Sequence, residues 1–208
     1  MNQPSYIRKR SIPKGSSKPH SPISLTFHPL TQKTWGLFEQ LMGERGGCGG
    51  CWCMSFRITK QEFDENKYDG NKRLMKELVR AGKPVGLVAL LDGEPVGWIA
   101  LSPREDFLRI ENARTLKRID DKPVWSIPCF FVRKDYRRVG ISKLLIQGAV
   151  DFAKKKKITT LEAYPVVPYS EKMPDAFLWI GALSAFKKNG FNVVQRNGKS
   201  KAIVRRDV

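Results

Sequence analysis

The stretch from Val124 to Val150 decides the fold, and it reads VWSIPCFFVRKDYRRVGISKLLIQGAV. Its first nine residues are mostly apolar and rich in β-forming side chains, which predicts a strand over 124–132. A short basic turn follows. From Gly140 onward, apolar residues recur at helical spacing on one face: Ile141, Leu144, Leu145, Ala149 and Phe152. The stretch therefore predicts a strand, a turn and a helix in direct succession.

The turn carries Arg137, Arg138, Gly140 and the small residue Ser142. A helix that starts directly after a strand directs several unpaired backbone N–H groups, and the positive end of its dipole, at one point. This arrangement predicts a site for a phosphate or a pyrophosphate. The alternative is a solvated basic turn without a ligand, because short glycine motifs also occur without one.

Length and composition favour one well-packed domain. The chain has 208 residues, of which 41% are hydrophobic. No apolar run approaches the roughly 18 residues of a membrane span, and the basic N-terminus lacks the apolar core of a secretory signal. We therefore expect a soluble, cytoplasmic protein with no membrane partner.

The formal net charge of +18 is unevenly distributed. Residues 1–24 hold five Lys or Arg and no acid, and residues 121–208 hold eighteen against seven acids. This field would attract a polyanionic ligand, and it leaves a nucleic-acid-associated module as an alternative. No aromatic-rich strand motif of an RNA-binding fold accompanies the charge, so nucleic acid is the weaker expectation.

Four cysteines, Cys48, Cys51, Cys53 and Cys129, raise the question of a metal site. A structural zinc site needs four ligands, and the two histidines, His20 and His28, lie upstream without ligand spacing. We therefore expect no metal but a small, partly buried thiol cluster. A disulfide is not expected either, since the chain shows no export signal.

The rest of the chain reads as alternating strands and helices, with Asp92-Gly93 and Asn197-Gly198 as tight-turn signals. A helix ending at Asn189-Gly190 is expected to start at Asp175 or Ala176. Expected strands cover 23–28, 85–91, 95–101, 158–164, 191–196 and 200–205, the other expected helices cover 31–42, 59–67 and 71–81, and 104–118 is expected to be loop with helical turns.

This order and the turn resemble the GNAT superfamily of N-acetyltransferases. Their signature Arg/Gln-x-x-Gly-x-Gly/Ala is similar to residues 137–142, with Ser142 as a mild departure. A further family pattern is matched by Ala182, Phe186, Gly190 and Phe191. Cys51 to Met54 and Glu162 to Pro165 resemble a less characterised branch. The resemblance implies a mixed α/β (α+β) fold, with a mostly antiparallel seven-stranded sheet flanked by helices.

The resemblance covers roughly residues 23–205. It implies one GNAT-like domain over 23–208, preceded by a basic flexible tail over 1–22. It also implies acetyl-coenzyme A as the co-substrate and an amine acceptor that the sequence does not identify, and a homodimer is left open. The implied cofactor-binding residues are those of the strand end and the turn: Phe130, Phe131, Val132, Arg137, Arg138, Val139, Gly140, Ile141, Ser142 and Lys143.

For catalysis, the resemblance implies direct attack of a neutral amine on the thioester. Glu162 is the expected base because it interrupts an apolar strand, although it could equally be the polar face of a half-exposed strand. The family's usual acid is a Tyr where this chain has Phe186, so either Tyr164 or Tyr169 substitutes for it, or the thiolate leaves unaided or takes its proton from water. A covalent acyl-cysteine relay at Cys129 is an alternative to a buried thiol, and a sensor that binds acyl-coenzyme A without turnover is a further one.

Overall fold

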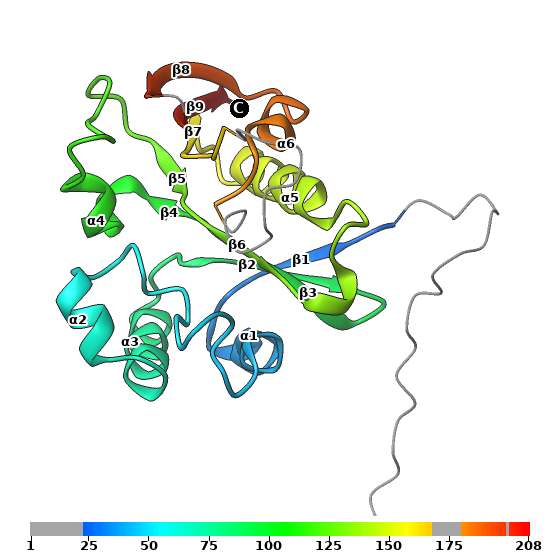
Figure 1. The fold of residues 1–208 in the computed structure, drawn as a ribbon. Helices are drawn as coiled ribbons and strands as arrows, with labels where there is room; N and C mark the ends of the chain where they lie inside the picture. Colours follow the sequence, from blue (N-terminus) through cyan, green and yellow to red (C-terminus); the bar gives the residue numbers. More distant parts are fainter. Residues whose placement is uncertain (1–22, 168–179, 199) are drawn as a thin grey trace, which may run out of the picture.

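The computed structural model describes residues 23–167, 180–198 and 200–208. Four strands form the first sheet, in the order β1-β2-β3-β6, and every pair in it is antiparallel. The strands are β1 (Thr26–Pro29), β2 (Gly86–Leu91), β3 (Glu94–Ala100) and β6 (Phe130–Val132). β2 and β3 form the hairpin that Asp92-Gly93 predicts (Figure 1).

Five strands form the second sheet, in the order β4-β5-β7-β9-β8. β5 and β7 are parallel, and the other pairs are antiparallel. The strands are β4 (Ser102–Pro103), β5 (Trp125–Ile127), β7 (Thr160–Ala163), β8 (Asn192–Asn197) and β9 (Lys201–Asp207). The expectation of a mixed, mostly antiparallel α/β fold is confirmed.

The described strands outnumber the seven expected because two of them are each broken. β3 ends at Ala100 and β4 begins at Ser102, while β5 ends at Ile127 and β6 begins at Phe130. Pro128 lies in the second break, and proline has no N–H to donate to a neighbouring strand. At these breaks the chain passes from one sheet to the other, so the two sheets diverge there.

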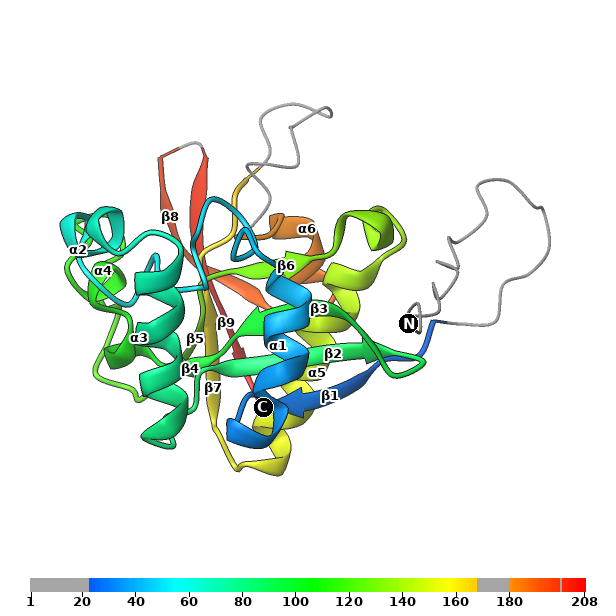
Figure 2. The ribbon, with the colours of Figure 1, turned by 90° about the horizontal axis from the view of Figure 1, so that it is seen from below.

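Helices cover both faces of the first sheet (Figure 2). On β2, Leu87 and Ala89 pack into the apolar cluster that contains α5 (Ile141–Lys155), while Val88 and Leu90 pack into the cluster that contains α1 (Trp35–Met42). Because side chains alternate along a strand, an apolar run such as β2 is buried on both sides. The result is a sheet between two helical layers.

The remaining helices, apart from the 12-residue α3 (Asp69–Arg80), are short. α2 (Lys60–Glu65) begins at a capping box in which Thr59 and Glu62 satisfy each other's backbone N–H groups. The others are α3 (Asp69–Arg80), α4 (Leu108–Glu111) and α6 (Leu183–Lys187), together with the 3₁₀ helices η1 (Gln32–Thr34), η2 (Arg104–Asp106) and η3 (Lys134–Tyr136).

The expected helix from residue 175 to Asn189 is wrong in its described part before Leu183, and residues 175–179 lie outside the described residues. Gly181 has a φ of +84°, and its carbonyl accepts a hydrogen bond from the Val166 N–H at 2.9 Å. Ala182 is extended and forms a β-bridge with Val166. A backbone paired in this way cannot be helical, so α6 starts only after the bridge.

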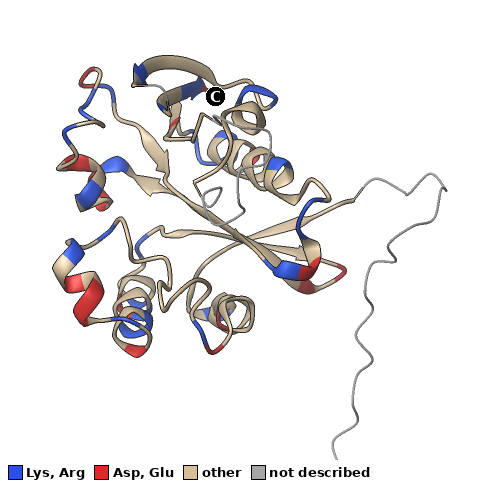
Figure 3. Cartoon of the chain, viewed as in Figure 1, with Lys and Arg blue, Asp and Glu red and all other residues tan. Residues whose placement is uncertain are grey.

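Figure 3 shows Lys and Arg on several elements, including α3, α4 and the turn before α5, rather than on one alone. The expected basic tail, residues 1–22, lies outside the described residues. Within the described part of the chain, no helix is both long and apolar enough to cross a membrane.

Candidate active site

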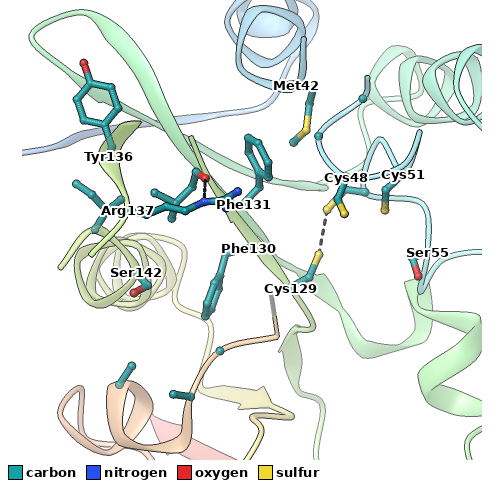
Figure 4. A pocket seen from close by; sticks show the side chains of 18 of the residues that line it. Met42, Cys48, Cys51, Ser55, Cys129, Phe130, Phe131, Tyr136, Arg137 and Ser142 are labelled. Carbon is teal, nitrogen blue, oxygen red and sulfur yellow. Dashed lines mark hydrogen bonds between the residues drawn. The ribbon is translucent and has the colours of Figure 1, made fainter. Parts of the chain in front are cut away.

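A cavity of about 680 Å³ opens between the N-terminus of α5, the strand β6 and the glycine- and cysteine-rich loop after α1 (Figure 4). Its size is that of a typical cofactor pocket. All of the expected cofactor-binding residues line it except Val139 and Lys143. The other lining residues are Met42, Gly46, Gly47, Cys48, Cys51, Cys53, Ser55, Phe63, Cys129, Tyr136, Gly181, Ala182 and Ala185.

The turn before α5 presents free backbone N–H groups to this cavity. Gly140 occupies the N-cap position of α5 with a φ of +89°. As a glycine it has no side chain that could bond to the first N–H groups of the helix. The amides of Gly140, Ile141 and Ser142 have no hydrogen-bond partner among the described residues. Arg137 is anchored beside them, since its Nε donates to the carbonyl of Val132 at 3.0 Å. Free amides, the helix dipole and a fixed guanidinium suit an anion.

β6 has one free edge, which faces the cavity. The carbonyl of Cys129 accepts from the N–H of Ala100, and the N–H of Arg133 donates to Val96, so alternate residues of this segment pair with β3. The backbone groups of Phe130 and Val132 therefore point away from β3. An extended amide-bearing ligand could pair with them as an added strand does.

Small residues form the wall opposite β6. Gly181, Ala182 and Ala185 line the cavity there. A Cβ on Gly181 would lie 2.4 Å from the ring of Phe130 and 2.8 Å from that of Phe186, so no larger residue fits without moving a ring. The channel is therefore bounded by β6 on one side and by Gly181, Ala182 and Ala185 on the other.

Two thiols meet at the end of β6 that is away from the turn (Figure 4). The Sγ atoms of Cys53 and Cys129 are 3.0 Å apart, and the indole N–H of Trp98 donates to Cys53 Sγ at 2.9 Å. Cys53 is partly exposed, whereas Cys129 is buried. The expected thiol cluster thus brings two of the four cysteines into direct contact.

The surroundings separate the pKa values of these thiols. The hydrogen bond from Cys129 lowers the pKa of Cys53, and the Trp98 N–H and the charge of Arg57 act in the same direction. The same hydrogen bond raises the pKa of Cys129 well above its ordinary 9.0, and burial adds to the rise. Burial raises the pKa of the neighbouring Cys51 to about 12. Cys53 is therefore the thiol that most readily becomes a thiolate.

The expected base, Glu162, does not line the cavity. It is fully buried on β7, where it pairs with the guanidinium of Arg104 and, at 2.7 Å, with that of Arg205. The hydroxyl of Tyr164 donates to the same carboxylate at 2.7 Å. To take a proton from an amine in the cavity, this carboxylate would have to leave all three partners.

Tyr164, the expected acid, belongs to the same buried group. Its hydroxyl lies 2.7 Å from Ser126 Oγ, and burial raises its pKa well above the ordinary 10.0. Tyr136 does line the cavity, but its hydroxyl donates to Glu94 at 2.7 Å. Tyr169, the other expected acid, lies outside the described residues.

Phe186 occupies a wholly apolar position. It is fully buried, with ring centroids 5.9 Å from Phe130 and 5.2 Å from Phe191. It packs behind the cavity wall and is not among the lining residues. Trp52 and Trp125 do not line the cavity either: Trp52 is buried and stacks on Trp35.

The contact that Cys53 makes with Cys129 and Trp98 could not be predicted from the sequence. The segment Cys51-Trp52-Cys53 was visible as a cluster, but its contact with Cys129 and Trp98 depends on the folded loop. In the described part of the chain, no three His, Cys, Asp or Glu side chains are grouped as metal ligands.

The model of the Acetyltransferase (GNAT) family matches residues 52–191, more than half of the chain. Comparison with curated proteins finds no match.

Solved structures with a similar fold include PaiA N-acetyltransferase from Thermoplasma acidophilum in complex with coenzyme A, at 20% identity and a TM-score of 0.47 over 89% of this chain and 99% of that one. Another is ribosomal-protein-alanine N-acetyltransferase from Brucella melitensis, at 17% identity and a TM-score of 0.48 over 88% and 99%. These distant likenesses carry no argument about the site, and the assignment rests on the family model.

Proposed function

The chain belongs to the acetyltransferase (GNAT) family, with acetyl-coenzyme A as its co-substrate, and we propose that it acetylates a primary amine in the cavity between α5, β6 and the cysteine-rich loop. One observation carries the proposal: the anion-binding turn, a free strand edge and a thiol pair line a single cavity in that order.

The turn before α5 holds the pyrophosphate of coenzyme A in this proposal. The free amides of Gly140, Ile141 and Ser142 converge there, and Arg137 and Arg138 add positive charge. A pyrophosphate needs several N–H donors aimed at one point, and the helix N-terminus supplies them without any side-chain rearrangement. Val139 and Lys143, which the sequence also suggested, do not line the cavity and are given no contact.

The pantetheine arm then runs along the free edge of β6. Its amides pair with the carbonyl of Phe130 and the N–H of Val132, while Gly181 and Ala182 close the channel from the other side. The thioester then lies at the end of β6 near Cys129. The backbone N–H of Phe130, at this end of the free edge, supplies a donor for the oxyanion.

The acceptor approaches from the loop side of the cavity. Met42, Phe63 and Phe131 make that side apolar, and no Asp or Glu is among the described lining residues. An ammonium ion gains no counter-charge in such a site, so the amine reacts in its neutral form. Close positioning of the amine beside the thioester supplies much of the acceleration.

Isothermal titration calorimetry with coenzyme A tests the donor half. Gly140→Ala forces a side chain into a left-handed backbone position at the pyrophosphate turn, and we expect the affinity to fall at least tenfold. Gly93→Ala is the matched control, because Gly93 has a φ of +82°, equally open space and a place in a distant hairpin. Equal affinity in both variants would contradict the proposed pyrophosphate site.

Release of free coenzyme A thiol across a panel of amines tests turnover. We expect release that depends on a primary amine, with the acetylated amine confirmed by mass spectrometry. Tight binding of acetyl-coenzyme A without turnover on any amine would favour an acyl-coenzyme A sensor instead. Absence of binding would overturn both.

A further inference from the structure

Two thiols lie in contact at the end of β6 that the proposed pantetheine path reaches. Cys129 immediately precedes β6, and Cys53 belongs to the loop after α1. Their sulfur atoms are 3.0 Å apart, and both residues line the cavity. In Figure 4, Cys129 lies beyond Phe130, away from Arg137 and Ser142 at the turn. A new bond between these two sulfurs would therefore alter the reactive end of the cavity.

The surroundings of Cys53 make its sulfur the more reactive of the two. Its side chain is partly exposed, whereas Cys129 is buried. The indole N–H of Trp98 can only donate, so Cys53 Sγ accepts this hydrogen bond at 2.9 Å. The hydrogen bond from Cys129 is the main cause that lowers the pKa of Cys53, and the bond from Trp98 adds to it. A thiolate is the form of cysteine that peroxides oxidise.

A buried guanidinium adds positive charge near Cys53. Arg57 is buried and donates to the carbonyl of Val85 at 3.0 Å and to the hydroxyl of Ser102 at 2.7 Å. Burial lowers the pKa of Arg57, and the negative charges of Cys53 and Asp106 oppose that lowering, with Cys53 the stronger of the two. Arg57 therefore favours the thiolate of Cys53 although a carboxylate also acts on it.

The folded loop holds Cys53 in this position. Trp52 and Cys53 have φ values of +41° and +60°, which residues with side chains rarely adopt. The Trp52 N–H donates to the carbonyl of Gly46 at 3.0 Å, and a Cβ on Gly46 would lie 2.3 Å from the Trp52 indole nitrogen. The packing of the loop thus keeps the two sulfurs together without a covalent bond between them.

The other two cysteines lack this arrangement. All four are free thiols, and all four lie in the described part of the chain. Cys48 is exposed, and burial raises the pKa of Cys51 to about 12, which keeps Cys51 in its unreactive thiol form. A contact between two sulfurs is therefore specific to Cys53 and Cys129.

We propose that Cys53 and Cys129 form a peroxide-reactive dithiol, a modification site at which a reversible disulfide joins the loop after α1 to the start of β6. The site goes beyond the proposed function, and only its effect on turnover rests on that function. An exposed sulfur with thiolate character beside a second, resolving cysteine is the arrangement that redox-sensitive sites share.

Hydrogen peroxide supplies the oxidising equivalents in the first step. The Cys53 thiolate attacks one peroxide oxygen, the O–O bond breaks, and hydroxide leaves as Cys53 becomes a sulfenic acid. This step removes the negative charge of Cys53. The hydrogen bond to Cys53 is the main cause that raises the pKa of Cys129, so oxidation of Cys53 releases Cys129 as a nucleophile.

The second step forms the sulfur–sulfur bond. The Cys129 sulfur attacks the sulfenic sulfur of Cys53, the S–O bond breaks, and the leaving hydroxide takes the proton of the Cys129 thiol as water. Counting the proton that Cys53 lost when it ionised, two thiols and one hydrogen peroxide give one disulfide and two waters. A thiol reductant reverses the change by exchange with the disulfide.

The disulfide changes the reactive end of the cavity but not the turn. Sulfurs that are 3.0 Å apart must approach by about 1 Å to reach bonding distance. This movement acts on Cys129, and the next residue, Phe130, supplies the oxyanion donor of the proposed function. A displacement of this size at a reacting centre slows the reaction. The pyrophosphate turn lies at the other end of β6, so binding of coenzyme A should persist.

Peptide mapping of the full chain tests the dithiol. The reduced protein is treated with a small excess of hydrogen peroxide, its remaining thiols are blocked with N-ethylmaleimide, and it is digested without reductant. We expect two peptides joined through Cys53 and Cys129, with Cys48 and Cys51 alkylated, and dithiothreitol should separate the pair. Alkylated Cys53 and Cys129 after peroxide treatment, or a disulfide between Cys48 and Cys51 alone, would overturn the proposal.

Single substitutions separate the roles of the two sulfurs. Cys129→Ser removes the resolving thiol, so we expect a sulfenic acid at Cys53 that dimedone labels, and no cross-link. Cys53→Ser should lose both the label and the cross-link. Cys48→Ser is the matched control and should cross-link at the rate of the unchanged protein. Thermal unfolding of each reduced variant confirms that it is folded, and a dimedone label on Cys48 in place of Cys53 would contradict the assignment.

Kinetics test the effect on turnover. We expect the oxidised protein to lose at least about tenfold in kcat, its affinity for coenzyme A to change less than about twofold, and dithiothreitol to restore kcat. Peroxide should leave the kcat of Cys53→Ser where it was before treatment. A cross-linked protein with an unchanged kcat would refute the effect on turnover.

The two readouts distinguish failure of this inference from failure of the proposed function. The cross-link is measured by mass and does not depend on turnover. A protein that forms the cross-link but acetylates no amine supports the dithiol and overturns the proposed function. An active acetyltransferase that never forms the cross-link overturns the dithiol alone.

Discussion

Two groups of ionisable side chains lie beside the broken strand that β5 and β6 form, one next to β5 and one at the break, and they differ in what surrounds them. Glu162 is held by Arg104, Arg205 and Tyr164 in a closed network that does not line the cavity. Cys53 meets Cys129 at the cavity wall. A buried carboxylate held by two guanidinium groups and a hydroxyl stabilises the fold, whereas a partly exposed sulfur can react. Polarity in an apolar strand does not by itself identify a catalytic group.

The largest expected effect tests the closed network. Glu162→Gln leaves two guanidinium groups without their shared counter-charge, and we expect a loss of about 3 kcal/mol in the free energy of unfolding. That corresponds to a drop in melting temperature of roughly 10 °C. Urea unfolding measures the loss, and kcat below the transition should change little.

Glu77→Gln on the exposed face of α3 is the matched control, because surface ion pairs contribute little. If Glu162→Gln instead abolished turnover at unchanged stability, the carboxylate would be the base that its sequence context suggested.

The second prediction concerns Phe186, which stands where the family usually has a tyrosine. Phe186→Tyr adds a hydroxyl among Phe130 and Phe191, where it has no partner, and should cost about 1–3 kcal/mol of stability. We expect no increase in kcat, since Phe186 does not line the cavity. Thermal unfolding and steady-state kinetics measure both. A kcat raised tenfold or more would show that an acid at this position reaches the leaving thiolate.

Acceptor preference gives a smaller effect. The loop side of the cavity has apolar residues and no described carboxylate. We expect an aromatic primary amine to exceed a polyamine of similar length about tenfold in kcat/KM, because a second ammonium ion would be desolvated without a partner. The reverse order would place an acidic group at the acceptor end.

The smallest effect is a shift along the pH axis. Because the pKa of Cys53 is lowered from 9.0, its thiolate persists to a lower pH than that of an ordinary thiol. The rate of alkylation by iodoacetamide should rise with pH, with a midpoint below pH 9.0. Peptide mapping isolates Cys53, and a short cysteine peptide is the reference. A midpoint at or above that of the peptide would contradict the thiolate assignment.

Local signals in the sequence predicted most of the fold. Asp92-Gly93 fixed the β2–β3 hairpin, and the helical period from Ile141 predicted α5. Both features depend on neighbouring residues, so the chain itself encodes them locally. The helix before Leu183 was misjudged because Gly181 and Ala182 pair with Val166, which is distant in the sequence, and such a pairing leaves no periodic pattern.

The candidate site also combines parts that local sequence signals predict with contacts between residues that are distant in the sequence. The turn before α5 is contiguous in sequence, and its geometry matches the expectation. The partners of Glu162 come from Arg104 and Arg205, which are far away along the chain, so the ion pairs could not be foreseen. Cys53 and Cys129 are 76 residues apart. Only the folded loop shows which of the four thiols meet.

The break at Pro128 has a thermodynamic consequence. Ile127 pairs with β7 in one sheet, and Phe130 pairs with β3 in the other. At this point, therefore, no strand pairing among the described residues joins the two sheets. A ligand that pairs with the free edge of β6, as proposed for the co-substrate, would bind only the folded chain. At one hundred times its dissociation constant it would add about 2.7 kcal/mol to the free energy of unfolding. The resistance of this protein to heat would therefore rise and fall with the supply of its own co-substrate.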